Sequence, residues 1–137
     1  MSQATPAKSK PRVTYWIGWG LAILLLPLFG MSAFFKLAQP AGFAENWTKA
    51  GMPIHTAFPI GVVEVACVVI YLIPQTSMLG AILLTGYLGG AVVTHARQDE
   101  SVVAPVVIGV VIWLALALRD PRIWKLIPFR TSPSKPL

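Results

Sequence analysis

Four long apolar stretches, separated by short polar segments, dominate the pattern of residues along the chain. They cover, in order, about residues 15–38, 56–73, 78–95 and 102–118. Each is within or near the roughly 17 to 25 residues that a helix needs to cross the hydrocarbon core of a bilayer. Their apolar residues run continuously and do not alternate, so the pattern favours membrane-spanning helices over the strands of a membrane β-barrel.

The composition supports an integral membrane protein. Hydrophobic residues make up 55% of the 137 residues and charged residues only 12%, about half of the roughly 25% that is typical of soluble domains. The first apolar stretch is longer than the apolar region of a signal peptide, and no clear small-residue cleavage site follows it, so we expect a retained helix. We therefore predict an all-α, transmembrane four-helix bundle over residues 14–118.

The distribution of Lys and Arg predicts the orientation of this bundle. Four spans place both termini on one side, and that side carries eight basic residues, against three on the other, which together are the 11 of the chain. The positive-inside rule assigns the more basic side to the cytoplasm. We predict a multi-pass membrane protein with both termini in the cytoplasm, and with a basic arm (residues 1–13) and a basic tail (residues 119–137) that contact lipid and not nucleic acid.

Two features outside the charged residues have alternative explanations. The connection of residues 39–55 places Phe43 and Trp47 four positions apart, which fits a short interfacial helix. Anchoring in lipid headgroups is the preferred role for Trp47, and contact with a ligand is the alternative. In the third stretch, Gly86 and Gly90 form a GxxxG pair that allows close helix packing. This packing either lies inside the bundle, which is the simpler explanation, or forms a homodimer.

Glu64 is a carboxylic acid in the middle of the second apolar stretch. Such a residue is normally inward-facing, and is either paired with a cation or protonated. Lys36 and His95, near the ends of the first and third stretches, fall at a similar depth. Gly61 leaves room beside the carboxyl group, and Tyr71, two turns deeper, is expected in the same cavity. These residues predict a polar binding site, and the alternative is an ion pair that only holds the helices together.

The position of His95 on its helix agrees with this site. Tyr87, Ala91 and His95 stand four residues apart and therefore share one helix face. The two histidines of the chain show no metal-ligand or haem-ligand spacing, so no metal is expected. Cys67 is the only cysteine, which excludes a dithiol motif within this chain. No phosphate loop or dinucleotide-binding glycine motif is present, so the chain itself predicts no bound cofactor other than a candidate quinone.

Four segments occur in the order GMSAFFKLAQP, GMP, IGVVEVACVVIYLIP and VVTHA. Over roughly residues 15–118, this series resembles the DoxX-like membrane proteins, although the family more often has a glycine a few residues before the lysine. The resemblance implies a four-helix bundle of the cytoplasmic membrane, linked in several members to quinone-dependent oxidoreductases or oxidative-stress complexes. The family positions that it carries onto this sequence are Lys36, Gly51, Pro53, Gly61, Glu64 and His95.

Three functions follow as hypotheses. The first is an accessory subunit of a membrane oxidoreductase system that binds a quinone-like lipophilic molecule, with ligand contacts from Lys36, Gly61, Glu64, Tyr71 and His95. The second is a small membrane enzyme in which Glu64, as a general acid, and His95 perform acid–base catalysis on a lipophilic substrate. The third is a structural assembly factor or chaperone that binds no ligand. The sequence does not decide whether the protein is an enzyme.

Overall fold

The computed structural model describes residues 12–126, and within that range all regular structure is helical. The four long helices are α1 (Val13–Ala38), α3 (Ala57–Leu72), α4 (Ser77–Arg97) and α5 (Val103–Arg119). The short elements are α2 (Phe43–Lys49), the 3₁₀ helix η1 (Ile54–Thr56) and α6 (Ile123–Leu126). The predicted arm lies almost wholly outside the described residues, as does the part of the predicted tail after residue 126.

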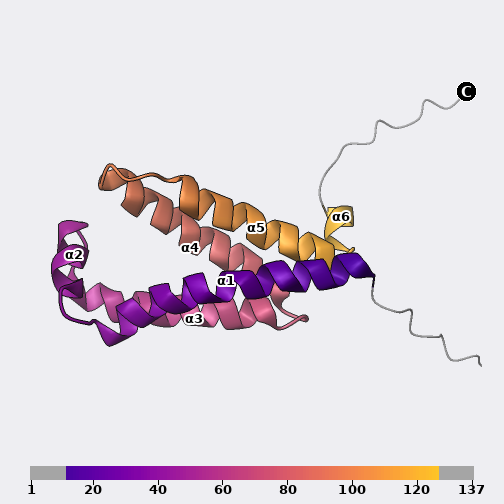
Figure 1. Cartoon of the computed structure of the whole chain (residues 1–137), viewed down its shortest axis with the longest axis horizontal. Coiled ribbons are helices and arrows are strands. Elements are labelled where there is room, and N and C mark those ends of the chain that lie inside the picture. The colour runs from indigo at the N-terminus through magenta and orange to yellow at the C-terminus, as the bar shows by residue number, and fades with distance from the viewer. Residues whose placement is uncertain (1–11, 127–137) are drawn as a thin grey trace, which may run out of the picture.

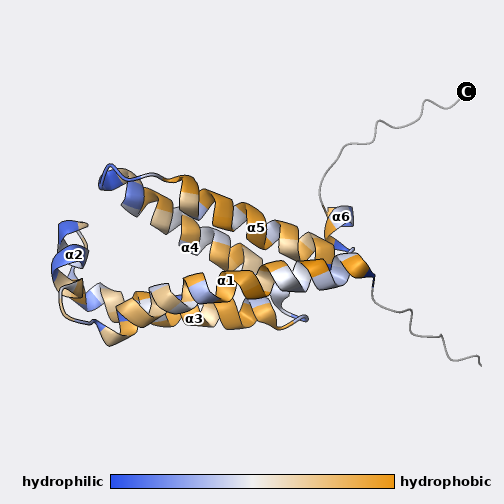
Figure 2. Ribbon diagram, viewed as in Figure 1, coloured by the Kyte–Doolittle hydropathy of each residue, from blue (hydrophilic) through white to orange (hydrophobic). Residues whose placement is uncertain are grey.

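The long helices have the length and surface of membrane spans. Three segments are long and apolar enough to cross a membrane, namely Val13–Ala38, Ile54–Leu72 and Ser77–Arg97. Helix α5 is apolar and 17 residues long. Large apolar side chains point outward, including Leu24 at 67% exposure and Val110 at 62%. Figure 2 shows apolar residues along all four helices and polar residues at α2 and the α4–α5 connection. This outer surface suits contact with lipid, which supports an all-helical membrane protein.

The four long helices are arranged as two pairs (Figure 1). Helix α1 lies beside α3, and α4 lies beside α5. The two pairs meet where α1 begins and α5 ends, and we call this the closed end. They diverge toward the opposite end, where α1 and α4 end and where α2 lies, and we call this the open end. The two pairs are therefore packed tightly against each other at one end only.

Glycines allow the close contact at the closed end. A Cβ atom on Gly80 would lie 2.3 Å from the backbone of Tyr71, and a Cβ atom on Gly18 would lie 2.7 Å from the carbonyl oxygen of Ala115. Helix α4 therefore touches α3, and α1 touches α5, with no side chain between the backbones. The largest fully buried apolar side chains are Leu84, Ile112 and Leu116.

Gly86 and Gly90 do not pack against another helix of the bundle. A Cβ atom on either residue would meet no atom within 4 Å. The expectation that this GxxxG pair packs inside the bundle is therefore wrong, because α4 has already diverged from the α1–α3 pair at this level. Both glycines line the cavity described below. A homodimer through Gly86 and Gly90 stays a prediction.

Candidate functional site

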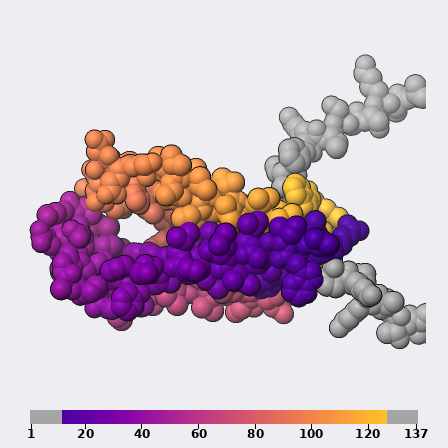
Figure 3. Space-filling view, in the orientation of Figure 1, coloured from indigo at the N-terminus to yellow at the C-terminus, as the bar shows by residue number. Residues whose placement is uncertain are grey.

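A cavity of about 480 Å³ lies between the two helix pairs toward the open end. In Figure 3 it is visible as an opening between α2 and the α4–α5 pair. Its volume is within the roughly 300 to 1,000 Å³ that is typical of small-molecule sites. Most of the 18 lining residues are apolar or glycine. The polar and ionisable side chains among them are Ser32, Lys36, Trp47, Glu64, Tyr87, Thr94 and His95.

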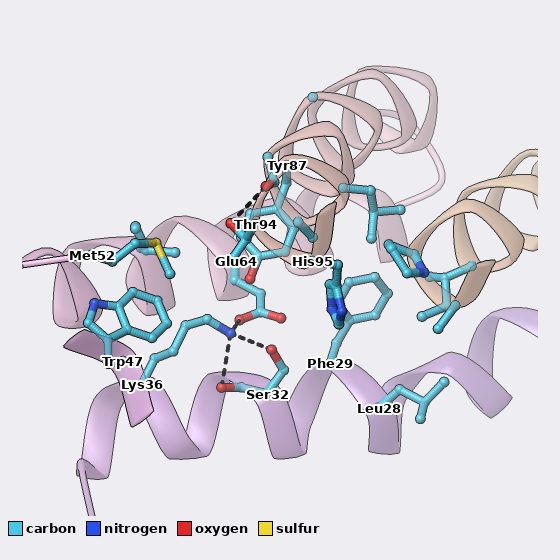
Figure 4. Close-up of a pocket in the computed structure, with 18 residues that line it drawn as sticks. Leu28, Phe29, Ser32, Lys36, Trp47, Met52, Glu64, Tyr87, Thr94 and His95 are labelled. Carbon is cyan, nitrogen blue, oxygen red and sulfur yellow. Dashed lines mark hydrogen bonds and ion pairs between the residues drawn. The ribbon is translucent and has the colours of Figure 1, made fainter. Parts of the chain in front are cut away.

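Lys36 and Glu64 form an ion pair at this cavity that joins α1 to α3. The Nζ atom of Lys36 lies 3.1 Å from Oε2 of Glu64. The Glu64 side chain is only 1% exposed and that of Lys36 is 13% exposed. The same ammonium donates hydrogen bonds to the hydroxyl and the carbonyl oxygen of Ser32, one turn earlier in α1 (Figure 4). Its three N–H donors are thus all used within the protein.

The other oxygen of Glu64 lacks such a contact. Its Oε1 atom is buried and accepts no hydrogen bond from residues 12–126. A carboxylate can accept several hydrogen bonds, and a buried acceptor without one costs about 1–3 kcal/mol. Tyr87 extends from α4 toward this carboxylate (Figure 4). The ion pair therefore satisfies one oxygen of Glu64, while the second is buried at the cavity wall with the Tyr87 side chain as its neighbour.

Gly61 has a clear structural role beside this pair. A Cβ atom at Gly61 would lie 2.9 Å from the Cβ atom of Lys36. The absence of a side chain lets α1 approach α3, so that Lys36 reaches Glu64. The group for which Gly61 leaves room is thus the lysine itself, and Gly61 does not line the cavity.

Tyr71 lies apart from the cavity, contrary to the expectation that it would line the same space as Glu64. Its side chain is buried, and its hydroxyl donates a hydrogen bond to the carbonyl oxygen of Ile112 at 2.8 Å. Tyr71 does share the buried face of α3 with Glu64. The two helix pairs meet at the depth of Tyr71, however, so this residue packs in the closed-end core.

His95 lines the cavity near the open end, as do Tyr87 and Ala91 of the same helix face. Its side chain is 39% exposed, and its Nδ1 atom lies 2.9 Å from Oε2 of Glu100. His95 therefore contacts the connection that follows α4 and does not contact Glu64. The structure brings Lys36, Glu64 and His95 to one cavity, and among them only the first two pair with each other.

The connection between α1 and α3 supplies two lining residues, Trp47 and Met52. The sequence left ligand contact as the alternative to lipid anchoring for Trp47 and gave no role to Met52. The Trp47 ring stacks on Phe43 with 5.3 Å between centroids, and its Nε1 atom donates to the carbonyl oxygen of Pro53 at 3.2 Å. Gly51, at a φ of +75°, provides the left-handed turn just before Met52. Placement at the cavity favours the ligand-contact alternative for Trp47 over anchoring alone.

Comparison with known families adds one finding to this geometry. A family model described as the DoxX-like family matches residues 20–118. The matched range contains the ion pair, His95 and the whole lining of the cavity. Comparison with curated proteins and with solved structures gave no match.

Proposed function

The chain belongs to the DoxX-like family, and on this premise we propose that it binds a lipophilic molecule of the quinone and quinol class in the open-end cavity. It would act as an accessory subunit of a membrane oxidoreductase system. Its location would be the bacterial inner membrane, with both termini in the cytoplasm. The observation that carries this proposal is the buried Oε1 atom of Glu64, which accepts no hydrogen bond from the described residues, in the wall of a cavity lined mostly by apolar residues and glycines.

The lining favours a ligand with an apolar body. Leu28, Phe29, Ile60, Leu88 and Ile108 contribute aliphatic or aromatic surface, which binds apolar groups by excluding water. The cavity lies between helices whose outer faces suit lipid, and a lipophilic molecule reaches such a place from the bilayer itself. A charged or sugar-like ligand would lose its hydration without gaining enough polar contacts.

The polar groups favour a ligand that donates a hydrogen bond. All three N–H donors of Lys36 are used by Glu64 and Ser32, so a ligand carbonyl would have to displace one of them. Oε1 of Glu64, in contrast, accepts no hydrogen bond of full geometry from the described residues, although the Tyr87 hydroxyl lies beside this carboxylate. A quinol hydroxyl supplies a donor for this oxygen and a quinone carbonyl does not. The cavity should therefore bind the reduced form more tightly than the oxidised form.

Acid–base catalysis is a second candidate function, carried by the same atom. Oε1 accepts no hydrogen bond from the described residues, which suits a proton-accepting general base better than the general acid expected from the sequence. In this role Oε1 would accept the proton of a bound hydroxyl group. Turnover of a lipophilic substrate by the isolated protein would distinguish this function from binding alone.

Binding is tested with the full chain in lipid nanodiscs under anaerobic conditions. A short-chain benzoquinone and the matching quinol are each titrated while tryptophan fluorescence is recorded, because Trp47 lines the cavity. We expect saturable quenching that is largely lost in Trp47→Phe. Glu64→Gln should weaken quinol binding about tenfold or more, since hydrogen bonds to charged groups contribute about 1.5–3 kcal/mol.

Glu45→Gln is the matched control, because Glu45 forms an exposed ion pair with Lys49 in α2 and does not line the cavity. It should leave both affinities unchanged. Tighter binding of the quinone than of the quinol would contradict the assigned role of Oε1. Empty nanodiscs measure how much quinone and quinol dissolve in the lipid alone. If the protein binds neither form beyond that amount, the proposed ligand class is wrong.

A further inference from the structure

Arg119 at the closed end is a buried charge that the proposed function does not use. It is the last residue of α5, and it is 9% exposed. Its guanidinium carbon lies 4.5 Å from the ring centroid of Trp19 and 4.6 Å from that of Tyr71. A Cβ atom on Gly18 would come within 2.7 Å of the Arg119 side chain. Residues of α1 and α3 thus form a buried pocket that holds the Arg119 side chain.

The two aromatic rings provide cation–π contacts with Arg119, and the Tyr71 hydroxyl lies close enough to interact with its side chain. These contacts still leave hydrogen-bond donors of the guanidinium unused. The Nε and Nη2 atoms are buried and donate no hydrogen bond to the residues that the structure describes. Cation–π contacts stabilise a desolvated charge, and the C-terminus of a helix also favours a cation. Neither effect satisfies the N–H groups in the guanidinium plane, whose geometry matches a bidentate oxyanion.

Arg119 also lines a second cavity, of about 410 Å³, at the closed end. Arg122 and Asp120 are the other charged residues of its lining, so the three side chains together carry a net positive charge. One Asp120 oxygen accepts a hydrogen bond from the backbone N–H of Arg122 at 2.9 Å, which engages that carboxylate with the turn after α5. Gln75 and Ser77 add uncharged polar groups to the same cavity.

We infer that this closed-end cavity binds the phosphate group of an anionic phospholipid, with Arg119 as the central contact. The cavity lies where the apolar helices end, beside Tyr15 and Trp19, at the level where aromatic residues meet lipid headgroups. A phosphate diester is the oxyanion that a bilayer supplies at this depth. Its oxygens accept hydrogen bonds in the plane of the guanidinium while its acyl chains extend along the lipid-facing helices.

The inference is tested by native mass spectrometry of the full-length protein in mild detergent. Phosphatidylglycerol is added, in parallel with phosphatidylcholine and diacylglycerol that have the same acyl chains. We expect phosphatidylglycerol to bind at least about tenfold more tightly than diacylglycerol, which lacks the phosphate, and more tightly than phosphatidylcholine, whose own cation competes for that phosphate. Inorganic phosphate is titrated against bound phosphatidylglycerol to identify the source of the anion.

Two variants assign the binding to this residue. Arg119→Gln and Arg119→Lys should both reduce phosphatidylglycerol affinity by about tenfold or more, because lysine keeps the charge but lacks the planar fork. Lys49→Gln, which removes an exposed charge at the open end, is the matched control and should bind as the unaltered protein does. Circular dichroism confirms that each variant is folded.

Unchanged phosphatidylglycerol affinity in a folded Arg119 variant would overturn the inference. Equal affinity for diacylglycerol in the unaltered protein would overturn it too, and this comparison decides the question even if neither variant folds. Displacement of phosphatidylglycerol by millimolar inorganic phosphate would assign the site to free phosphate and overturn the lipid assignment.

Discussion

The ammonium of Lys36 lies 3.1 Å from one carboxylate oxygen of Glu64, and the two partners differ in their burial. Glu64 is sealed inside the bundle at 1% exposure, whereas Lys36 keeps 13% of its side chain accessible. Lys36 has a flexible stem that can move toward more polar surroundings. The shorter Glu64 side chain has no comparable freedom. This difference determines what happens when either partner is removed.

Lys36→Met should destabilise the protein more than Glu64→Gln. Breaking a buried pair costs about 3–5 kcal/mol when it leaves an uncompensated charge, and Glu64 is the more deeply buried charge. The double variant Lys36→Met, Glu64→Gln should cost less than the sum of the single variants. Unfolding in detergent, followed by circular dichroism, measures these differences. The exposed pair of Lys49 and Glu45 is the control, and removing it should cost less than about 1 kcal/mol.

Gly80→Ala should destabilise the closed end by about 1–3 kcal/mol, as overpacked cores do. The added Cβ atom would lie 2.3 Å from the Tyr71 backbone, which cannot move without separating α3 from α4. Gly20→Ala is the matched helical control, because its Cβ atom would meet nothing within 4 Å. That change should be neutral or slightly stabilising. Equal melting temperatures for the two variants would contradict the close contact.

Tyr71→Phe should lower the free energy of unfolding by about 0.6 kcal/mol and by no more than about 1.7 kcal/mol, the average and the maximum found for hydrogen bonds between membrane helices. It removes the hydrogen bond from the hydroxyl to the Ile112 carbonyl oxygen and keeps the aromatic ring against Arg119. Because Tyr71 does not line the open-end cavity, quinol affinity should stay the same. A large loss of quinol binding in this variant would show that Tyr71 does contribute to the ligand site.

Gly90→Leu should weaken quinol binding strongly while the protein stays folded. Gly90 lines the open-end cavity, and a Cβ atom there meets no other helix, so a leucine side chain would occupy space that the ligand needs. Gly89→Leu is the control on the same helix, since Gly89 also has open space but does not line this cavity. Equal effects of the two substitutions in the fluorescence titration would argue against this location for the ligand.

The proposed orientation is tested by cysteine labelling in a Cys67→Ala background. Thr48→Cys, in α2 at the open end, should react with a membrane-impermeant maleimide in intact cells. Gln75→Cys, between α3 and α4 at the closed end, should react only after the inner membrane is made permeable. Both positions are exposed in the structure, so a difference in reactivity reports the side of the membrane. The reverse pattern would place the termini outside.

The sequence was sufficient to predict the four long helices and the common level of Lys36 and Glu64 along them. The length of an apolar run determines where a spanning helix begins and ends. Counting residues from the helix ends then puts Lys36 and Glu64 at a similar level. Depth and helix face could not show that Tyr71 belongs to a different environment from Glu64, because that depends on how far the two helix pairs diverge. This separation arises from packing among four helices, as at Gly18 and Gly80, and no single helix encodes it.

Two further residues show the same limit. Trp47 lies in a connection whose path depends on the turn at Gly51 and on the stack with Phe43, so its helix face alone did not reveal its contact with the cavity. Arg119 was interpreted only as one of the positive charges that orient the bundle. Its burial depends on Trp19 and Tyr71, which come from different helices and meet only in the folded protein.

The uneven contact between the helix pairs has a mechanical consequence. Close backbone contacts at Gly18 and Gly80 make the closed end a natural pivot, and a small rotation there changes the spacing at the open end without breaking the core. A ligand that fills the gap between the pairs should therefore stiffen the angle between them. Ligand binding in the open-end cavity would thus change the surface that the two helix pairs present to any protein packed against both of them.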